Sequence, residues 1–163
     1  MEIGATKAVQ DRLKTTKIEE SKGASLVFCW DTHLTKIKGR NVLFIVNASN
    51  RYTIAMTDIE PRNWNYYTMY IRSVIHGVMQ EMGYSEDQIG QYFKMSGDTT
   101  VTKTHGRKSV GGINRMVMDA QYFGKKLEKE AKYQWELSEY LNRDICQPEG
   151  FDAYGYPSEL FKL

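Results

Sequence analysis

The sequence has few prolines and cysteines and contains no long apolar run. Its 163 residues include three prolines and two cysteines, and 41% of them are hydrophobic. This composition excludes a collagen-like chain, a disordered chain and a disulfide scaffold. A membrane-spanning helix needs about 18 consecutive apolar residues, whereas the longest apolar run, Val42–Val46, has only the length of a strand. We therefore expect one globular domain with a hydrophobic core of its own.

Several signatures of chemistry are also missing. The sequence contains neither a phosphate-binding glycine loop nor a dinucleotide-binding glycine pattern. The three histidines are scattered, and no His-Glu-x-x-His pattern or Cys/His ladder is present to hold zinc. We therefore expect no metal ion and no cofactor.

The remaining absences concern the location of the protein. The N-terminal residues lack the basic and apolar segments of a secretory signal, so we expect a cytoplasmic protein with no membrane partner. Cys29 and Cys146 stand far apart and form no Cys-x-x-Cys pair. This spacing indicates two free thiols, with Cys29 as a small core residue.

Short runs of apolar or alternating residues predict the strands of a sheet. They lie at residues 3–6, 25–30, 34–38, 42–47, 52–56 and 99–104. Turn residues such as Gly39–Asn41 separate the runs in the first half of the chain, so we expect three of the strands to form an antiparallel meander. The nearly all-apolar run 42–47 is expected at the centre of the sheet.

Apolar residues at three- and four-residue steps predict the helices. Such helices are expected at residues 8–13, 64–82, 85–97 and 109–120. Ser85 and Gln88 have the spacing of a capping box, which predicts the start of the third of these helices, and Gly97 predicts its end. The charged stretch Lys14–Gly23 is expected to be a surface loop.

The C-terminal part differs in pattern from the rest of the chain. We expect residues 123–163 to form a helical and irregular extension of a core domain at residues 1–122. Within it, Lys125–Asn142 is predicted as a helix. The residues expected to face inward are Leu127, Ala131, Trp135 and Leu137 or Ser138. The predicted fold class is α+β, with a mainly antiparallel sheet packed against helices on one side.

Two stretches of the sequence lack carboxylates and carry four basic residues each. The first, Thr32–Thr57, holds Lys36, Lys38, Arg40 and Arg51. The second, Thr99–Met118, holds Lys103, Arg107, Lys108 and Arg115. If the two stretches fold side by side, they form a basic face suited to nucleic-acid phosphates or to an acidic protein surface. The alternative is that acidic residues from elsewhere fill the space between them.

The corner Lys103–Ser109, between a predicted strand and a predicted helix, is the sharpest candidate for binding. It places His105 among cationic side chains at the start of a helix, where backbone amides attract an anion. A phosphate or a carboxylate would fit there, and Asn114, one turn further, would hold the loop backbone. The alternative is a glycine turn whose hydroxyl groups only cap the helix.

His33 and His105 each stand near lysine or arginine, which suits a metal-independent ribonuclease. A histidine would take the 2′-hydroxyl proton while cations stabilise the phosphorane, and Asp31 or Asp58 would orient the ring. The alternative is that both are ordinary surface histidines. His76 falls inside the long predicted helix, which favours a structural role.

Several segments, in order and with similar gaps, resemble a known family. They are residues 1–13 as strand then helix, Trp30–Leu34, Lys38–Asn47, Arg51-Tyr52 and Thr102–Val110, with Asn114 at the end. The family is a bacterial one catalogued as domain of unknown function 6933, and the resemblance covers about residues 1–122. Such small domains are often met in phages and other mobile elements, so the resemblance implies such a setting. It implies no particular chemistry.

Three hypotheses for the function follow. The first is a non-enzymatic binding module whose basic face acts on a nucleoprotein or a nucleic acid, RNA included. In a mobile element, such a module would be an inhibitor of a host defence nuclease, that is, an anti-CRISPR protein. The second is a small ribonuclease that uses His33 or His105 with Arg107. The third is an adaptor whose acidic, aromatic tail docks a partner helix or forms a homodimer.

Overall fold

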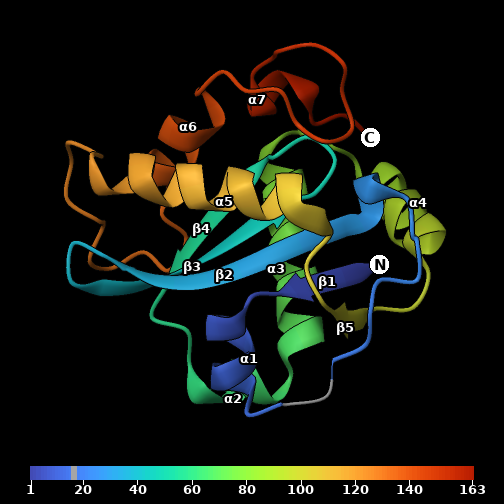
Figure 1. Ribbon diagram of the computed structural model, residues 1–163, viewed down its shortest axis with the longest axis horizontal. Coiled ribbons are helices and arrows are strands. Elements are labelled where there is room, and N and C mark those ends of the chain that lie inside the picture. The colour runs from blue at the N-terminus through green and yellow to red at the C-terminus, as the bar shows by residue number, and fades with distance from the viewer. Residues whose placement is uncertain (16–17) are drawn as a thin grey trace.

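The sheet combines strands that are neighbours in the sequence with strands that are far apart. In the computed structural model, which describes residues 1–15 and 18–163, five strands lie in the order β4-β3-β2-β1-β5 (Figure 1). They are β1 (Glu2–Ala5), β2 (Cys29–Ile37), β3 (Arg40–Asn47), β4 (Thr53–Thr57) and β5 (Thr100–Thr102). β2, β3 and β4 pair antiparallel, whereas β1 pairs parallel with both β2 and β5. The α+β class is confirmed, and the sheet is mixed rather than purely antiparallel.

Helices cover both faces of this sheet, which corrects the expectation of one covered face. They are α1 (Lys7–Leu13), α2 (Pro61–Asn65), α3 (Tyr67–Glu81), α4 (Glu86–Ser96), α5 (Gly106–Gln121), α6 (Trp135–Asn142) and α7 (Pro157–Leu160). A 3₁₀ turn, η1 (Leu26–Phe28), precedes β2. In Figure 1, α5 crosses the sheet on the side of the viewer, and α3 lies behind it.

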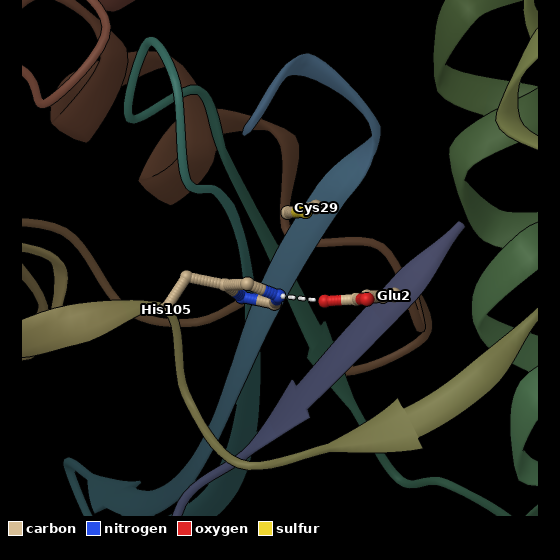
Figure 2. A group of neighbouring side chains, drawn as sticks. All are labelled: Glu2, Cys29 and His105. Atoms are coloured by element: carbon tan, nitrogen blue, oxygen red, sulfur yellow. Dashed lines mark hydrogen bonds and ion pairs between the residues drawn. The ribbon is translucent and has the colours of Figure 1, made fainter. Parts of the chain in front are cut away.

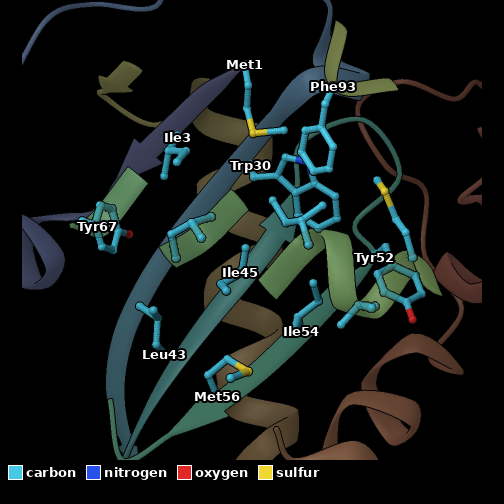
Figure 3. Close-up of a cluster of buried hydrophobic side chains, with 14 of the residues drawn as sticks. Met1, Ile3, Trp30, Leu43, Ile45, Tyr52, Ile54, Met56, Tyr67 and Phe93 are labelled. Atoms are coloured by element: carbon cyan, nitrogen blue, oxygen red, sulfur yellow. The ribbon is translucent and has the colours of Figure 1, made fainter. Parts of the chain in front are cut away.

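The sequence of β3 explains why both faces are covered. Leu43 and Ile45 lie on one side of this strand, Phe44 and Val46 lie on the other, and all four are buried. A strand that is apolar on both sides is stable only where both sides are packed. Leu43 and Ile45 join the core around Trp30, with residues of α3 and α4 (Figure 3), whereas Phe44 and Val46 join a second core with α5 and α6.

β2 replaces two of the predicted strands. Residues 25–30 and 34–38 were expected as separate strands, but β2 pairs with β3 without a break from Trp30 to Ile37. The turn into β3 consists of Lys38 and Gly39, whose φ angles of 49° and 82° are both positive. A two-residue turn of this kind matches the right-handed twist of a hairpin, so β3 begins at Arg40, inside the predicted turn.

The helices after β4 follow the prediction in part. The capping box of α4 is present, because Ser85 Oγ accepts the N–H of Gln88 at 3.3 Å and the Ser85 N–H donates to Gln88 Oε1 at 2.9 Å. The long helix predicted over 64–82 is interrupted at Tyr66, whose φ and ψ of −114° and 42° leave the helical region. Two helices, α2 and α3, therefore stand where one was expected.

The predicted helix over Lys125–Asn142 begins only at Trp135. Before it, the Thr57 N–H donates to the Lys132 carbonyl at 2.7 Å, and the Gln134 N–H donates to the Ala55 carbonyl at 2.9 Å. Because these backbone groups form hydrogen bonds with the outer edge of β4, they are not available for the hydrogen bonds of a helix. Pairing with the sheet therefore overrides the helical spacing of the apolar residues. Trp135 is 44% exposed, although it was expected to face inward.

Side chains of α6 complete the cover over the edge of β4. Ser138 Oγ accepts the N–H of Ala55 at 3.0 Å, and Asn142 Oδ1 accepts the N–H of Thr53 at 2.7 Å. An uncovered edge strand would offer free N–H and C=O groups to another chain. The residues beyond 123 therefore close the sheet on its β4 side.

Within the predicted surface loop Lys14–Gly23, residues 16–17 lie outside the described residues. Its later part runs beside β5, where the Lys103 N–H donates to the Glu19 carbonyl at 2.9 Å.

Among the helices of the described residues, none combines the length and the apolar character that crossing a membrane requires.

Candidate functional site

The parallel side of the sheet carries polar side chains toward α5. β1 and β2 pair in a register that sets Glu2 beside Cys29 and Gly4 beside Asp31. Alternate residues of a strand share a face, so these four residues face the same way. Asp31 also pairs with Val46, which packs against α5 residues. Glu2, Cys29 and Asp31 therefore lie beneath the N-terminal end of α5.

His105, the residue before α5, closes this group from above. Its Nδ1 lies 2.7 Å from Asp31 Oδ1, and its Nε2 lies 3.0 Å from Glu2 Oε2. Figure 2 shows the ring of His105 directed toward Glu2, with Cys29 on the neighbouring strand. The exposed fractions of the side chains are 2% for His105, 0% for Asp31 and 5% for Glu2. We call Glu2, Cys29, Asp31, His105 and Ser109 the polar cluster.

Asp31 occupies the position at which the sequence predicts an anion. Its carboxylate accepts the backbone N–H of His105 at 3.2 Å and the hydroxyl of Ser109. The start of a helix attracts a negative charge, and here the charge comes from β2 of the same chain. A phosphate from outside would have to displace this carboxylate.

Gly4 makes room for that arrangement. A Cβ atom on Gly4 would lie 1.8 Å from Asp31 Oδ1 and 3.0 Å from the backbone of Thr104. Asp31 can therefore extend over β1 to His105 only because β1 has no side chain at this position.

The polar cluster holds a positive imidazolium. Burial by itself lowers the pKa of His105, but hydrogen bonds to Asp31 and Cys29 outweigh burial and raise this pKa to about 10. Burial likewise acts to raise the pKa of Glu2, but hydrogen bonds from Ser21, from the Lys22 N–H and from His105 leave that pKa lowered. Opposite charges are thus paired inside the protein.

The two histidines considered for RNA cleavage have different surroundings. With 2% of its side chain exposed, His105 is enclosed by the polar cluster and cannot reach a ribose at the surface. His33 is half-buried, its Nδ1 lies 3.2 Å from Thr6 Oγ1, and burial lowers its pKa. His76 is partly exposed on α3, where it contacts Glu86 at 3.1 Å.

The first basic stretch lies near the C-terminal end of α5. Gln121, the last residue of this helix, donates to the Lys36 carbonyl at 3.0 Å. Lys38 Nζ donates to the Lys125 carbonyl at 2.9 Å. Arg40 forms an ion pair with Asp58. Lys36 and Lys38 are exposed.

The second basic stretch begins at the opposite end of α5. Lys103 forms an ion pair with Glu20, and Lys108 Nζ donates to the Pro148 carbonyl at 3.2 Å. Arg107 and Asn114 are exposed. A helix of 16 residues is about 24 Å long, so the turn at Lys38 and the corner at Arg107 are far apart.

Arg51 is the exception among the first group of cations, because its Nη2 donates to the Gly112 carbonyl in the middle of α5 at 2.9 Å. The structure therefore does not bring the two basic stretches together as one face. The reason is that the second stretch runs along a helix, with the first stretch near its far end.

A surface hollow lies between α5 and α6, and we call it the α5–α6 groove. It has a volume of about 540 Å³ and is lined by aromatic and charged residues: Asp119, Phe123, Lys125, Trp135, Glu136, Glu139, Tyr140, Arg143 and Asp144. A neighbouring hollow of about 310 Å³ shares Trp135, Glu139 and Arg143 with it. These three residues form the ridge between the two hollows.

The charges of the α5–α6 groove are paired at the surface. Lys125 Nζ lies 2.8 Å from Glu136 Oε1, and Arg143 Nη2 lies 2.7 Å from Glu139 Oε1. Acidic residues outnumber basic ones in the lining, and Asp144 is exposed. The groove thus combines negative charge with the rings of Phe123, Trp135 and Tyr140.

A further hollow, of about 440 Å³, lies beside the β2–β3 turn, and we call it the hairpin hollow. Its lining includes Arg12, Arg40, Asp58 and Trp64. The guanidinium of Arg12 lies over the Trp64 ring, 5.4 Å from its centre. Because Arg40 is paired with Asp58, Arg12 supplies the less engaged cation of this hollow.

The polar cluster and the α5–α6 groove both lie within the part of the chain that a family model matches. The model is described as "Domain of unknown function (DUF6933)", and it matches residues 2–160. The chain belongs to the DUF6933 family. The match continues past residue 122, where the resemblance noted from individual motifs ends. No curated protein and no solved structure matches the chain.

In this DUF6933 chain, the sequence predicted Asp31 or Asp58 as the partner of His33 or His105, and the structure places Asp31 against His105 at 2.7 Å. The contribution of Glu2 and Cys29 was missed, because these residues stand far from His105 in the sequence and no spacing motif links them. The available signal was a set of polar residues at alternate positions in apolar strands, Glu2 with Gly4 and Cys29 with Asp31. That signal has meaning only once β1 is known to pair with β2.

Proposed function

We propose that the chain is a non-enzymatic protein-binding module, and that its α5–α6 groove takes a basic segment of a partner protein. The observation that carries the proposal is the position of Trp135, 44% exposed on the ridge between two hollows and flanked by Glu136 and Glu139. Tryptophan is among the residues that most often dominate binding energy, especially near the centre of an interface.

The charge of this region selects the class of partner. From Tyr133 to Phe161 the sequence holds six acidic residues and one basic residue, Arg143. Of the acidic residues, Asp144, Glu149, Asp152 and Glu159 are exposed. Since Arg143 and Lys125 are already paired with glutamates, an incoming lysine or arginine meets an excess of carboxylates. Such complementarity favours a basic partner and speeds its encounter.

The apolar surface of the same region indicates what accompanies the basic side chains. Tyr140 is 44% exposed, and its ring lies 5.4 Å from that of Phe123. Trp135 packs edge-on against Tyr133, with the ring centres 5.8 Å apart. Rings held in this way lose little freedom on binding. The proposed partner segment therefore carries at least one large apolar side chain between its basic residues.

The proposal is tested by fluorescence anisotropy with a labelled probe peptide that alternates lysine and arginine around a single leucine. Trp135→Ala is expected to weaken binding at least about tenfold, because the ring supplies the apolar contact. Tyr66→Ala is the matched control, since Tyr66 is 66% exposed between α2 and α3, outside the groove lining, and its loss should leave the affinity unchanged. Equal affinity of Trp135→Ala and the wild type would contradict the proposal, as would failure of the wild type to bind the peptide at low salt.

A second candidate function rests on the hairpin hollow. We propose it as a site for single-stranded nucleic acid, because Arg12 and Trp64 line it and the exposed Lys36 and Lys38 lie on the same hairpin. Phosphates would bind the cations and a base would contact the ring. An inhibitor of a host defence nuclease, acting in a mobile element, would use this site to bind nucleic acid or a nucleoprotein. That role stays a prediction.

A labelled single-stranded RNA of uridines tests the second function. The double variant Lys36→Ala, Lys38→Ala is expected to bind more weakly and to show a smaller dependence of affinity on salt. Lys103→Ala is the control, because Lys103 lies at the other end of α5 and pairs with Glu20. If Lys103→Ala lowers the affinity as much as the double variant, binding is not at the hairpin hollow.

We also propose the cytoplasm as the compartment of this protein. Cys29 and Cys146 are both free thiols. Reduced cysteines are typical of the cytosol, where disulfides are rare.

A further inference from the structure

The polar cluster contains three side chains of the kinds that bind transition metals. One carboxylate oxygen of Glu2, the Sγ of Cys29 and one ring nitrogen of His105 all lie within 4.8 Å of one another. The nitrogen that faces Glu2 is Nε2 (Figure 2). We propose that Glu2, Cys29 and His105 form a binding site for a zinc-type metal ion that ties β1, β2 and the start of α5 together.

The distances suit a tetrahedral ion after small movements. With bonds of about 2.0–2.3 Å from zinc to nitrogen, oxygen and sulfur, two donors of a tetrahedral site stand roughly 3.3–3.8 Å apart. His105 Nε2 and Glu2 Oε2 are 3.0 Å apart, and no pair among the three donors exceeds 4.8 Å. Shifts of about an ångström or less per side chain, within the reach of rotamer adjustment, would therefore bring all three into place. A water molecule or the second oxygen of Glu2 would be the fourth ligand.

Neighbouring groups already orient two of these donors, His105 and Glu2, as they do in metal sites. The other ring nitrogen of His105, Nδ1, faces Asp31 at 2.7 Å, and Asp31 also accepts the Ser109 hydroxyl. A carboxylate behind the histidine is the usual arrangement in zinc proteins, where it fixes the tautomer and the ring orientation. Glu2 is held in the same way, because its Oε1 accepts the Lys22 N–H at 2.8 Å.

Zinc binds cysteine as the thiolate and histidine through a ring nitrogen that carries no proton. Any proton on Cys29 Sγ or on His105 Nε2 therefore leaves to solvent when the ion binds, while Nδ1 keeps its contact with Asp31. The positive charge of the ion is then met by the thiolate and by the carboxylate of Glu2.

The donor types indicate the class of metal. A thiolate and an imidazole favour zinc and similar borderline ions, whereas calcium and magnesium prefer oxygen donors throughout. Cys29 is fully buried, and Glu2 and His105 expose 5% and 2% of their side chains. Such an enclosed site stabilises the fold, because the ion binds the native state and the unfolded chain offers no assembled site.

The experiment uses the full chain, unfolded and refolded with or without zinc chloride and then dialysed. Elemental analysis of the wild type is expected to find about one zinc ion per chain. After refolding with cobalt(II) in place of zinc, the near-ultraviolet spectrum should show a thiolate-to-cobalt charge-transfer band. Cys29→Ser should abolish this band, and Cys146→Ser, at the other buried thiol, should leave both zinc content and band unchanged.

Further measurements separate a metal site from a general loss of structure. Far-ultraviolet circular dichroism identifies the variants that fold, and Asp31→Asn, which keeps the shape of the side chain, should weaken zinc binding by about 10–100-fold. Zinc should also raise the melting temperature of the wild type and not that of Cys29→Ser. A wild type that retains no zinc, or a cobalt band that is lost equally in Cys29→Ser and Cys146→Ser, would overturn the proposal. Binding of the basic peptide to the groove does not depend on either result.

Discussion

At the N-terminal end of α5, the charged groups of the polar cluster are buried and bonded to one another, whereas the charged groups at its C-terminal end lie at the surface near an exposed tryptophan, Trp135. His105 and Asp31 expose 2% and 0% of their side chains. Near the other end, Arg115 and Asp119 expose 70% and 23% and meet at 3.2 Å. The same helix therefore connects one region where charge is enclosed with another where charge remains open to a partner.

This difference separates stability from binding. A buried charge is strongly destabilising unless it is paired, so losing a charged partner within the polar cluster should lower the free energy of unfolding. An exposed ion pair adds little stability, because water screens it. Residues near the C-terminal end of α5 are thus free to serve a partner, and the enclosed residues of the polar cluster are not.

The largest effect is expected from Asp31→Ala. This change leaves the buried imidazolium of His105 without its nearest partner and should lower the free energy of unfolding by about 3–5 kcal/mol. Asp119→Ala, near the other end of the same helix, should cost at most about 1 kcal/mol. Urea denaturation followed by circular dichroism measures both. If the two variants lost the same free energy of unfolding, the proposed difference between the two ends of α5 would be wrong.

The next effect concerns the space beside Asp31. Gly4→Ala would place a methyl group 1.8 Å from Asp31 Oδ1 and should cost about 1–3 kcal/mol or more through overpacking. Gly111→Ala, in α5, meets no atom within 4 Å and should stabilise the chain by about 0.5–1 kcal/mol, because alanine favours a helix more than glycine does. Thermal melts of the two variants should therefore shift in opposite directions. A Gly4→Ala variant as stable as the wild type would show that Asp31 does not need this space.

A smaller effect on stability is expected from the acidic residues of the groove. The double variant Glu136→Gln, Glu139→Gln removes two surface ion pairs and should change the unfolding midpoint only slightly. It should nevertheless weaken binding of the basic peptide, and the loss should shrink as salt concentration rises. Anisotropy titrations at two salt concentrations check this. A variant that binds as the wild type does would show that the groove carboxylates do not select the partner.

The smallest effect is expected from His33, which lies on the same face of the sheet as His105. The ring of His105 contacts the carboxylate of Asp31, whereas the ring of His33 contacts the hydroxyl of Thr6, and burial lowers the pKa of His33. A histidine whose pKa is lower in the folded chain lends full stability above its unfolded pKa, which is about 6.5. That stability is lost as the pH falls through this value toward the folded pKa.

Urea denaturation at about pH 7.5 and about pH 5 should therefore show a stability change toward acid that is less favourable in the wild type than in His33→Gln, since glutamine does not titrate. The two proteins must be compared with each other, because the raised pKa of His105 adds stability to both as the pH falls toward about 6.5. The same slope in both proteins would assign the acid sensitivity to other groups.

Local patterns in the sequence were sufficient for much of the secondary structure. The nearly all-apolar run 42–47 predicted a central strand, and β3 is buried on both faces from Val42 to Asn47. Ser85 and Gln88 predicted the start of α4. These features depend on residues a few positions apart, and such residues interact in the same way in most surroundings. The α+β class could therefore be derived before any contact between distant segments was known.

The site could not be derived in the same way. Parallel pairing of β1 with β2 and β5 follows from contacts across the chain, and the four residues of β1 carry too little pattern to choose a partner. Residues 132–134 likewise leave a helical pattern to pair with β4. Strand partner and register depend on which distant surfaces fit together, a property that local preference does not encode. The tertiary fold alone brings Glu2, Cys29 and His105 within reach of one ion, and it alone leaves Trp135 exposed between two hollows.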